Sequence, residues 1–140
     1  MTTQAHPLEV YRRFQSYLIG GEFGRVGEVA DLEGYTETCV GLTGWTTGLA
    51  TALGNFQENV ASKLTDMVPA EDDIIEAEDM LVIRGSFEAT HSGEFLGVPP
   101  TGRRVAFDFV DMYRVTGGLI VWRYLLCDWK GLLDRLTAAA

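Results

Sequence analysis

The sequence predicts an α+β fold in which helices come first and a curved antiparallel sheet follows. Up to about residue 64, apolar residues recur every three or four positions, which is the spacing of an amphipathic helix. From Met67 onward they alternate with polar residues, which is typical of strands with one buried face. The chain has 140 residues and a hydrophobic content of 46%, so one core and a single domain over residues 1–140 are expected.

Three helical segments are expected in the first half. Residues 7–19 begin with a proline and stop at a Gly-Gly pair, which are favourable start and end signals. A short helix follows over residues 23–30, and residues 35–40 alternate as a short strand does. Residues 43–64 begin with a capping threonine and carry an apolar stripe over about six turns, which predicts a third helix.

Strands and turns account for the second half. Residues 81–91 and 105–115 alternate so that their odd positions are buried. Residues 97–102 (GVPPTG) form a loop, because two prolines cannot continue a strand ladder. A Gly-Gly turn leads into the last strand, residues 119–127, and Asp128 can cap a closing helix of about two turns.

Composition and charge exclude several classes of partner. The 11 basic and 20 acidic residues give a net charge of −9, which repels nucleic acid and anionic lipid. No apolar run approaches the ~18 residues that cross a bilayer. No secretory signal is visible, so a cytoplasmic protein is expected, with Cys39 and Cys127 as free buried thiols. The two histidines lack metal-site spacing and no Gly-rich cofactor motif occurs, so neither a metal nor a cofactor is expected.

Asp111 is the most informative single residue. It stands on a strand face that otherwise reads as apolar, where an unpaired charge costs several kcal/mol. Burial raises the pKa of a carboxyl in such a place, which suits general acid/base catalysis near neutral pH. A structural ion pair, or a bulge that turns Asp111 outward, would explain the residue equally well.

Arg123 and His91 are the candidate companions of Asp111. If the last hairpin carries a one-residue bulge at its Gly-Gly turn, Asp111 lies opposite Leu125 and diagonal to Arg123. Arg123 could then hold Asp111 ionised or polarise a ligand carbonyl; without the bulge, Trp122 faces inward instead. His91 ends an apolar face and could shuttle a proton, or it could be a hydrogen-bonded structural residue.

Aromatic residues are numerous for one domain, and some of them must be plain core. In a pocket they would bind a flat polycyclic molecule, with Tyr35 and Tyr113 as hydrogen-bond donors to a ketone or phenol. The candidate ligand-binding residues are Tyr35, Trp45, Phe107, Phe109, Tyr113 and Leu125.

Residues 90–105 (THSGEFLGVPPTGRRV), with this order of elements, resemble the SnoaL-like polyketide cyclase group of the NTF2-like superfamily. The resemblance continues through residues 113–118 and 128–133. It implies a cone in which a bent sheet wraps helices around one deep pocket. It also implies action on polyketide-derived rings, by cyclisation or hydroxylation, without metal or organic cofactor. Aldol cyclases of this group carry a pocket aspartate on the last strand, and the matching residue here is Leu125, which cannot move a proton.

Two functions are therefore kept open. The first is a cofactor-independent tailoring enzyme for a polycyclic compound, with Asp111 as general acid/base and Arg123 and His91 orienting or polarising the ligand. The second is a non-catalytic binding or scaffold domain with the same pocket. A cavity filled by Phe107, Phe109 and Leu125 would favour the second function.

The last strand is apolar on both faces, which means that both are covered. The helices can cover only the concave face. We therefore expect a homodimer joined sheet to sheet, with Trp122 and Tyr124 near its centre. The alternative is that the closing helix folds back over this surface.

Overall fold

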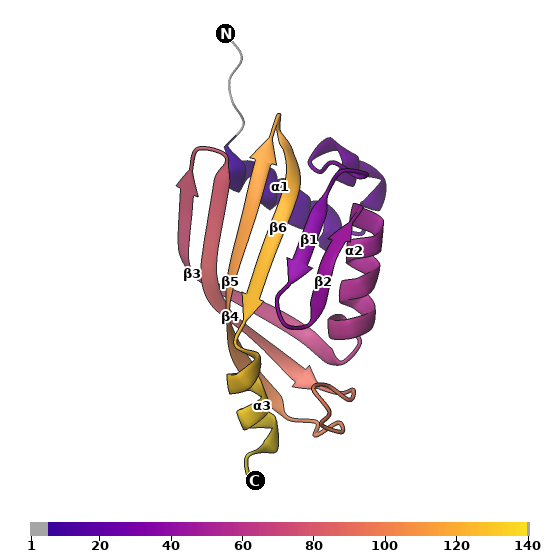
Figure 1. The fold of residues 1–140 in the computed structure, drawn as a ribbon, viewed down its shortest axis with the longest axis vertical. Coiled ribbons are helices and arrows are strands. Elements are labelled where there is room, and N and C mark those ends of the chain that lie inside the picture. Colours follow the sequence, from indigo (N-terminus) through magenta and orange to yellow (C-terminus); the bar gives the residue numbers. More distant parts are fainter. Residues whose placement is uncertain (1–5, 140) are drawn as a thin grey trace.

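The computed structural model describes residues 6–139, in which helices pack against one curved sheet (Figure 1). The helices are α1 (Pro7–Ile19), the 3₁₀ helix η1 (Phe23–Glu28), α2 (Leu49–Phe56), the π-helical turn η2 (Gln57–Ala61) and α3 (Trp129–Thr137). The strands are β1 (Thr36–Cys39), β2 (Thr43–Thr47), β3 (Leu64–Ala77), β4 (Met80–His91), β5 (Arg104–Thr116) and β6 (Leu119–Cys127). The predicted α+β cone is confirmed.

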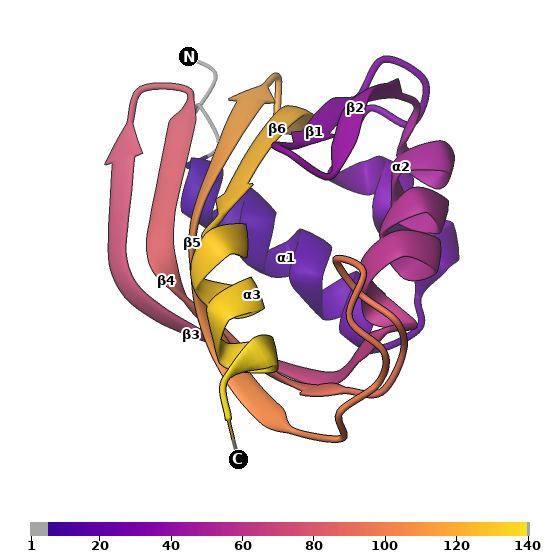
Figure 2. The same ribbon diagram turned by 60° about the horizontal axis from the view of Figure 1, so that its bottom comes forward.

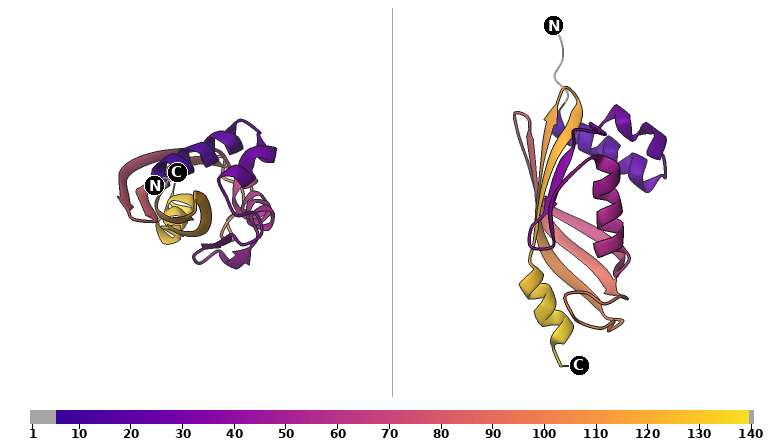
Figure 3. Two further views of the ribbon diagram at one scale, coloured as in Figure 1. Left: turned by 90° about the horizontal axis from the view of Figure 1, so that it is seen from above. Right: turned by 45° about the vertical axis from the view of Figure 1, so that its right-hand side comes forward.

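The six strands form one curved sheet in the order β2-β1-β6-β5-β4-β3. All neighbours are antiparallel except β1 and β6, which run parallel. Helices α1 and α2 lie on the concave side of the sheet (Figures 2 and 3). The buried face of α1 carries Val10, Tyr11, Phe14 and Tyr17, which follow the three/four spacing seen in the sequence. The core therefore lies between these helices and the concave face.

The alternation predicted for the long strands is confirmed. In β5 the odd positions are buried from Val105 to Val115, and Asp111 is among them with 3% exposure. The last hairpin carries the one-residue bulge that turns Arg123 inward, but not at the Gly-Gly turn where it was predicted. It lies at Val121, because Val115 pairs with Ile120 while Arg114 pairs with Trp122. Ile120 and, beyond the bulge, Arg123, Leu125 and Cys127 therefore share the concave face with the odd residues of β5.

The predicted six-turn helix from Thr43 is wrong in its first third. Residues 43–47 form strand β2, paired with β1, and the helix begins only at Leu49. Gly48 has a φ of 93°, a left-handed conformation that breaks a helix at this point. Trp45 consequently lies on an edge strand and is 58% exposed.

The closing helix α3 begins as predicted. The Asp128 carboxylate accepts a hydrogen bond from the backbone N–H of Gly131 at 2.9 Å. Leu132 and Leu136 of α3 are buried, and Arg135 donates to the carbonyl of Ala106 at 2.8 Å. The helix therefore packs beside β5.

Two expectations from the sequence, on the cysteines and on membrane-spanning helices, can be compared with the described residues. Cys39 and Cys127 are free buried thiols, as predicted. Within residues 6–139, no helix combines the length and the apolar character that crossing a membrane requires.

Candidate functional site

A cavity of about 190 Å³ lies between α1, α2 and the concave face of the sheet. It is smaller than the ~300–1,000 Å³ typical of sites for drug-sized ligands, so it suits a compact ring system. Half of its lining is apolar: Phe14, Leu18, Ala52, Leu53, Phe56, Pro69, Phe87 and Phe109. The other half is polar or carries a polar tip: Tyr11, Gln15, Tyr35, Glu37, Glu71, Asp111, Tyr113 and Arg123.

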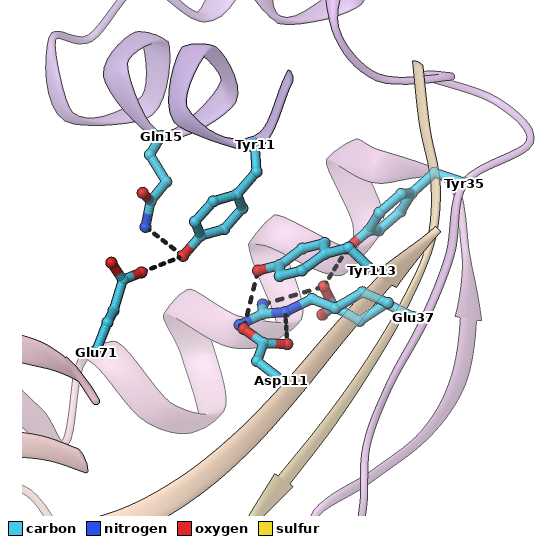
Figure 4. A network of polar contacts seen from close by, with 8 residues as sticks. Tyr11, Gln15, Tyr35, Glu37, Glu71, Asp111 and Tyr113 are labelled. Atoms are coloured by element: carbon cyan, nitrogen blue, oxygen red, sulfur yellow. Dashed lines mark hydrogen bonds and ion pairs between the residues drawn. The ribbon is translucent and has the colours of Figure 1, made fainter. Parts of the chain in front are cut away.

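Asp111 and Arg123 form a bidentate ion pair at the cavity wall. Nε and Nη2 of Arg123 donate to the two carboxylate oxygens of Asp111 at 2.9 and 2.8 Å. The Tyr113 hydroxyl donates to Oδ2 of Asp111 at 3.0 Å (Figure 4). The strand register explains this contact, because Arg123 pairs with Tyr113 and is therefore diagonal to Asp111.

Glu37 is a second carboxylate in the same cluster, and the sequence reasoning missed it. It comes from β1, where it pairs in register with Arg123 across the parallel contact with β6. Its Oε1 accepts from Nη1 of Arg123 at 3.3 Å and from the Tyr35 hydroxyl (Figure 4). Alternation over residues 35–40 was a usable signal, because it places Glu37 on the same face as the buried Tyr35 and Cys39.

Burial governs the protonation states in this cluster. Burial raises the pKa of Asp111, while the charge of Arg123 and hydrogen bonds from Arg123 and Tyr113 oppose that rise. Burial acts to lower the pKa of Arg123, but the charge and hydrogen bond of Asp111 together with the charges of Tyr113 and Glu37 outweigh it, so the pKa lies well above its ordinary value. Burial also raises the pKa of Tyr35 and of Tyr113. Both tyrosines therefore stay protonated and act as donors.

A second group of polar residues lines the cavity from α1 and β3. The Tyr11 hydroxyl donates to Oε2 of Glu71 at 3.3 Å and accepts from Gln15 at 2.6 Å (Figure 4). Arg12 forms an ion pair with Oε1 of Glu71 at 2.7 Å. The rings of Tyr11 and Tyr113 are 4.9 Å apart, so the two polar groups meet on one side of the cavity.

Of the residues expected at the site, Asp111, Arg123, Tyr35, Phe109 and Tyr113 line the cavity. The remaining four, Trp45, Phe107, Leu125 and His91, lie outside its lining.

Each of these four has a physical reason for its place. Trp45 is on the exposed edge strand. Phe107 packs against Phe87 and Trp129, with ring centroids 5.6 and 5.7 Å apart. Leu125 is buried in the sheet opposite Asp111. His91 is fully buried, and its Nδ1 accepts from the backbone N–H of Thr101 at 3.2 Å, which ties the proline loop to β4.

Over residues 6–139, no group of three or more His, Cys, Asp or Glu side chains is arranged to hold a metal ion. The chemistry that the arrangement can perform is proton transfer and hydrogen bonding at the wall of a largely apolar cavity.

Solved structures with this fold come from several bacteria. IdmH from Streptomyces antibioticus, a candidate polyketide cyclase, is 25% identical with a TM-score of 0.75, covering 96% of this chain and 100% of that one. AclR from Streptomyces galilaeus, a candidate hydroxylase, is 20% identical with a TM-score of 0.72, covering 96% and 97%. A SnoaL-like polyketide cyclase from Agrobacterium tumefaciens is 17% identical with a TM-score of 0.75, covering 95% and 99%.

The fold is NTF2-like, with a curved sheet that wraps around helices. The family model described as SnoaL-like polyketide cyclase matches residues 9–136. This chain therefore belongs to the SnoaL-like polyketide cyclase family. A search among curated proteins finds no match to its sequence.

Proposed function

We propose that this protein is a cofactor-independent enzyme that transforms a flat polyketide-type ring compound by acid/base chemistry, as a cyclase or a hydroxylase. The observation that carries the proposal is the Glu37–Arg123–Asp111 cluster, a set of buried charges at the wall of a cavity with many aromatic residues. Membership of the family supports the reaction class, and so do the cyclase and hydroxylase descriptions of structures with the same fold.

Each part of the cluster has a task in such a reaction. Arg123 has five N–H groups, of which three are used by the two carboxylates, so two remain to polarise a ligand carbonyl. The carboxylates supply the acid/base function that Leu125 cannot provide. The assignment of this function to Asp111 stays a prediction, and Phe14, Phe56 and Phe109 would hold the ring.

A binding or scaffold domain remains the second candidate, and one observation favours it. Both oxygens of Asp111 already accept hydrogen bonds from Arg123 and Tyr113, as they would in a purely structural ion pair. A protein of that kind would bind a ring compound without exchanging a proton with it.

Hydrogen exchange in 1-tetralone, a two-ring ketone, separates the two functions. In D₂O, an acid/base enzyme removes a proton from the carbon beside the carbonyl and returns a deuteron, which proton NMR follows. We expect exchange above the buffer rate, and a loss of about 10²-fold or more in Asp111→Asn. Asp108→Asn is the matched control, because Asp108 is exposed on the opposite face of the same strand. A wild type that exchanges no faster than the buffer would contradict the enzyme, and equal rates for the wild type and Asp111→Asn would remove Asp111 from the mechanism.

We propose in addition that two copies join through the outer face of the sheet. The rings of Trp122 and Tyr124 stack there at 6.1 Å, and Trp45 lies 6.1 Å from Trp122. Leu126 is 44% exposed beside them, because α3 packs next to β5 and leaves it open. Aromatic side chains of this kind are favoured anchors of protein interfaces.

A further inference from the structure

The two carboxylates bound to Arg123 differ in what their oxygens can still do. Both oxygens of Asp111 accept charged hydrogen bonds, and the residue is 3% exposed. Glu37 uses only Oε1, which accepts from both Arg123 and Tyr35. Its Oε2 accepts no hydrogen bond from any residue between 6 and 139.

The free oxygen of Glu37 is not sealed in the core. In the described part of the chain, the only fully buried side-chain polar atom without a partner is Nε2 of His91. Oε2 of Glu37 therefore keeps access to open space, and Glu37 lines the cavity with a side chain that is 12% exposed. A general base needs such a lone pair within reach of the proton that it removes.

Asp111 is less suited to take that proton. It would first have to give up a charge-assisted hydrogen bond from Arg123, and such bonds are the stronger kind. Glu71, the other carboxylate in the lining, is held in the same way, since one oxygen accepts from Tyr11 and the other pairs with Arg12. Of the three lining carboxylates, Glu37 alone has an oxygen without a donor in the described structure.

We propose that Glu37 is the catalytic base and that Asp111 is a positioning residue that fixes Arg123. This inference rests on the proposed function. Oε2 of Glu37 takes the proton from the carbon beside a ligand carbonyl, and the C–H electron pair forms the C=C bond of the enolate. The charge moves to the carbonyl oxygen, which accepts from the free N–H groups of Arg123, and protonated Glu37 later returns the proton. No other reactant is required.

The same geometry specifies the class of ligand. Glu37 and Asp111 together carry two negative charges against the single positive charge of Arg123, while Glu71, the third lining carboxylate, is paired with Arg12. An anionic group in the cavity would be repelled. The inferred substrate is therefore an uncharged ring ketone with an acidic C–H bond beside the carbonyl.

The test uses 5-nitrobenzisoxazole, a flat bicyclic carbon acid with no carbonyl to polarise. A base removes its C3 proton, the C–H electrons form a nitrile, and the N–O bond breaks to give a coloured phenolate. We expect the wild type to accelerate this elimination and Glu37→Gln to lose about 10²-fold or more of the acceleration, because glutamine keeps the contacts of Oε1 but accepts no proton. Glu88→Gln, which removes an exposed carboxylate on β4, should retain the wild-type rate.

A folded Glu37→Gln variant with the wild-type rate overturns the inference. If that variant fails to fold, Glu37→Asp replaces it: the charge is kept, the carboxylate moves back by one methylene, and about 10²-fold should again be lost. Full activity of Glu37→Asp likewise overturns the inference. A wrong assignment of the base to Glu37 can be distinguished from a wrong assignment of the protein as an enzyme. If Glu37 variants are fully active while Asp111→Asn loses 1-tetralone exchange, the base is Asp111 and the proposed function stands.

Discussion

Replacing Arg123 by methionine is the most direct test of the buried cluster. Methionine has a similar length and is unbranched, so it fills the space without a charge. The substitution removes three charge-assisted hydrogen bonds, at 2.9, 2.8 and 3.3 Å, and leaves Asp111 and Glu37 without their cation. The side chains of Arg123 and Asp111 are 17% and 4% exposed, so solvent replaces little of what is lost. Breaking a buried ion pair on one side costs about 3–5 kcal/mol, which we expect as the loss in the free energy of unfolding.

An exposed ion pair provides the matched control. Arg84 and Asp73 form an ion pair at 2.7 Å, but their side chains are 58% and 56% exposed. Water solvates both groups after one is removed, so Arg84→Met should change the free energy of unfolding little. The two substitutions are chemically identical, but Arg123 is buried and bound to two carboxylates, whereas Arg84 is exposed and bound to one.

The pH dependence of the Arg123→Met variant gives an independent check of the same reasoning. Burial raises the pKa of Asp111, and the variant lacks the Arg123 charge that opposes the rise. A carboxyl with a raised pKa in the folded state holds its proton more tightly than in the unfolded state. Its contribution to stability is therefore present below the ordinary carboxyl pKa and is lost as the pH rises. The deficit of Arg123→Met against the wild type should be largest at neutral pH and shrink towards pH 4.

Urea unfolding at several pH values measures both effects. The midpoint of Arg123→Met should fall well below that of Arg84→Met at neutral pH, with unchanged slopes. Equal midpoints for the two variants would show that Arg123 is solvated, and the roles assigned to Asp111 and Glu37 would then lose their basis.

Three further outcomes are expected. His91→Ala should lower the free energy of unfolding by about 1–3 kcal/mol, because a fully buried side chain is removed and the backbone N–H of Thr101 loses its acceptor; a stability equal to the wild type would contradict this. Trp122→Glu should sediment as a monomer at a concentration where the wild type is a dimer, and a monomeric wild type would refute the interface. Leu125→Asp should destabilise the fold more at neutral than at acidic pH, since a buried carboxyl beside Asp111 has a raised pKa, and a pH-independent effect would argue against that contact.

Strands β4 and β5 could be predicted because buried and exposed side chains alternate along them. Every odd position of β5 from Val105 to Val115 is buried, so the sequence placed Asp111 in the interior directly. From the sequence, the pairing of Asp111 with Arg123 could be predicted only on the assumption that the last hairpin is bulged. It depends on one extra residue at Val121, and a bulge leaves no distinctive mark in the sequence.

The helical half was harder to predict because a short apolar run is ambiguous between helix and strand. Trp45 stands at helical spacing from the residues of α2, yet it lies in an edge strand that Gly48, with its positive φ, separates from that helix. Glu37 was missed for a different reason. Its partner Arg123 is 86 residues away in sequence and is reached through the one parallel strand pair of the described sheet, which local periodicity cannot reveal.

The leucine at position 125 and the carboxylate at position 37 are parts of one electrostatic arrangement. Leu125 lies directly opposite Asp111 in the strand register, and like charges at directly opposite positions destabilise a sheet. A carboxylate there would add a third negative charge to a cluster in which Glu37 and Asp111 already share the cation Arg123. One of the three would have to be protonated or leave the cluster. An apolar residue at 125 therefore allows Asp111 to bind Arg123 with both oxygens, and this in turn leaves Glu37 with the free oxygen that proton transfer requires.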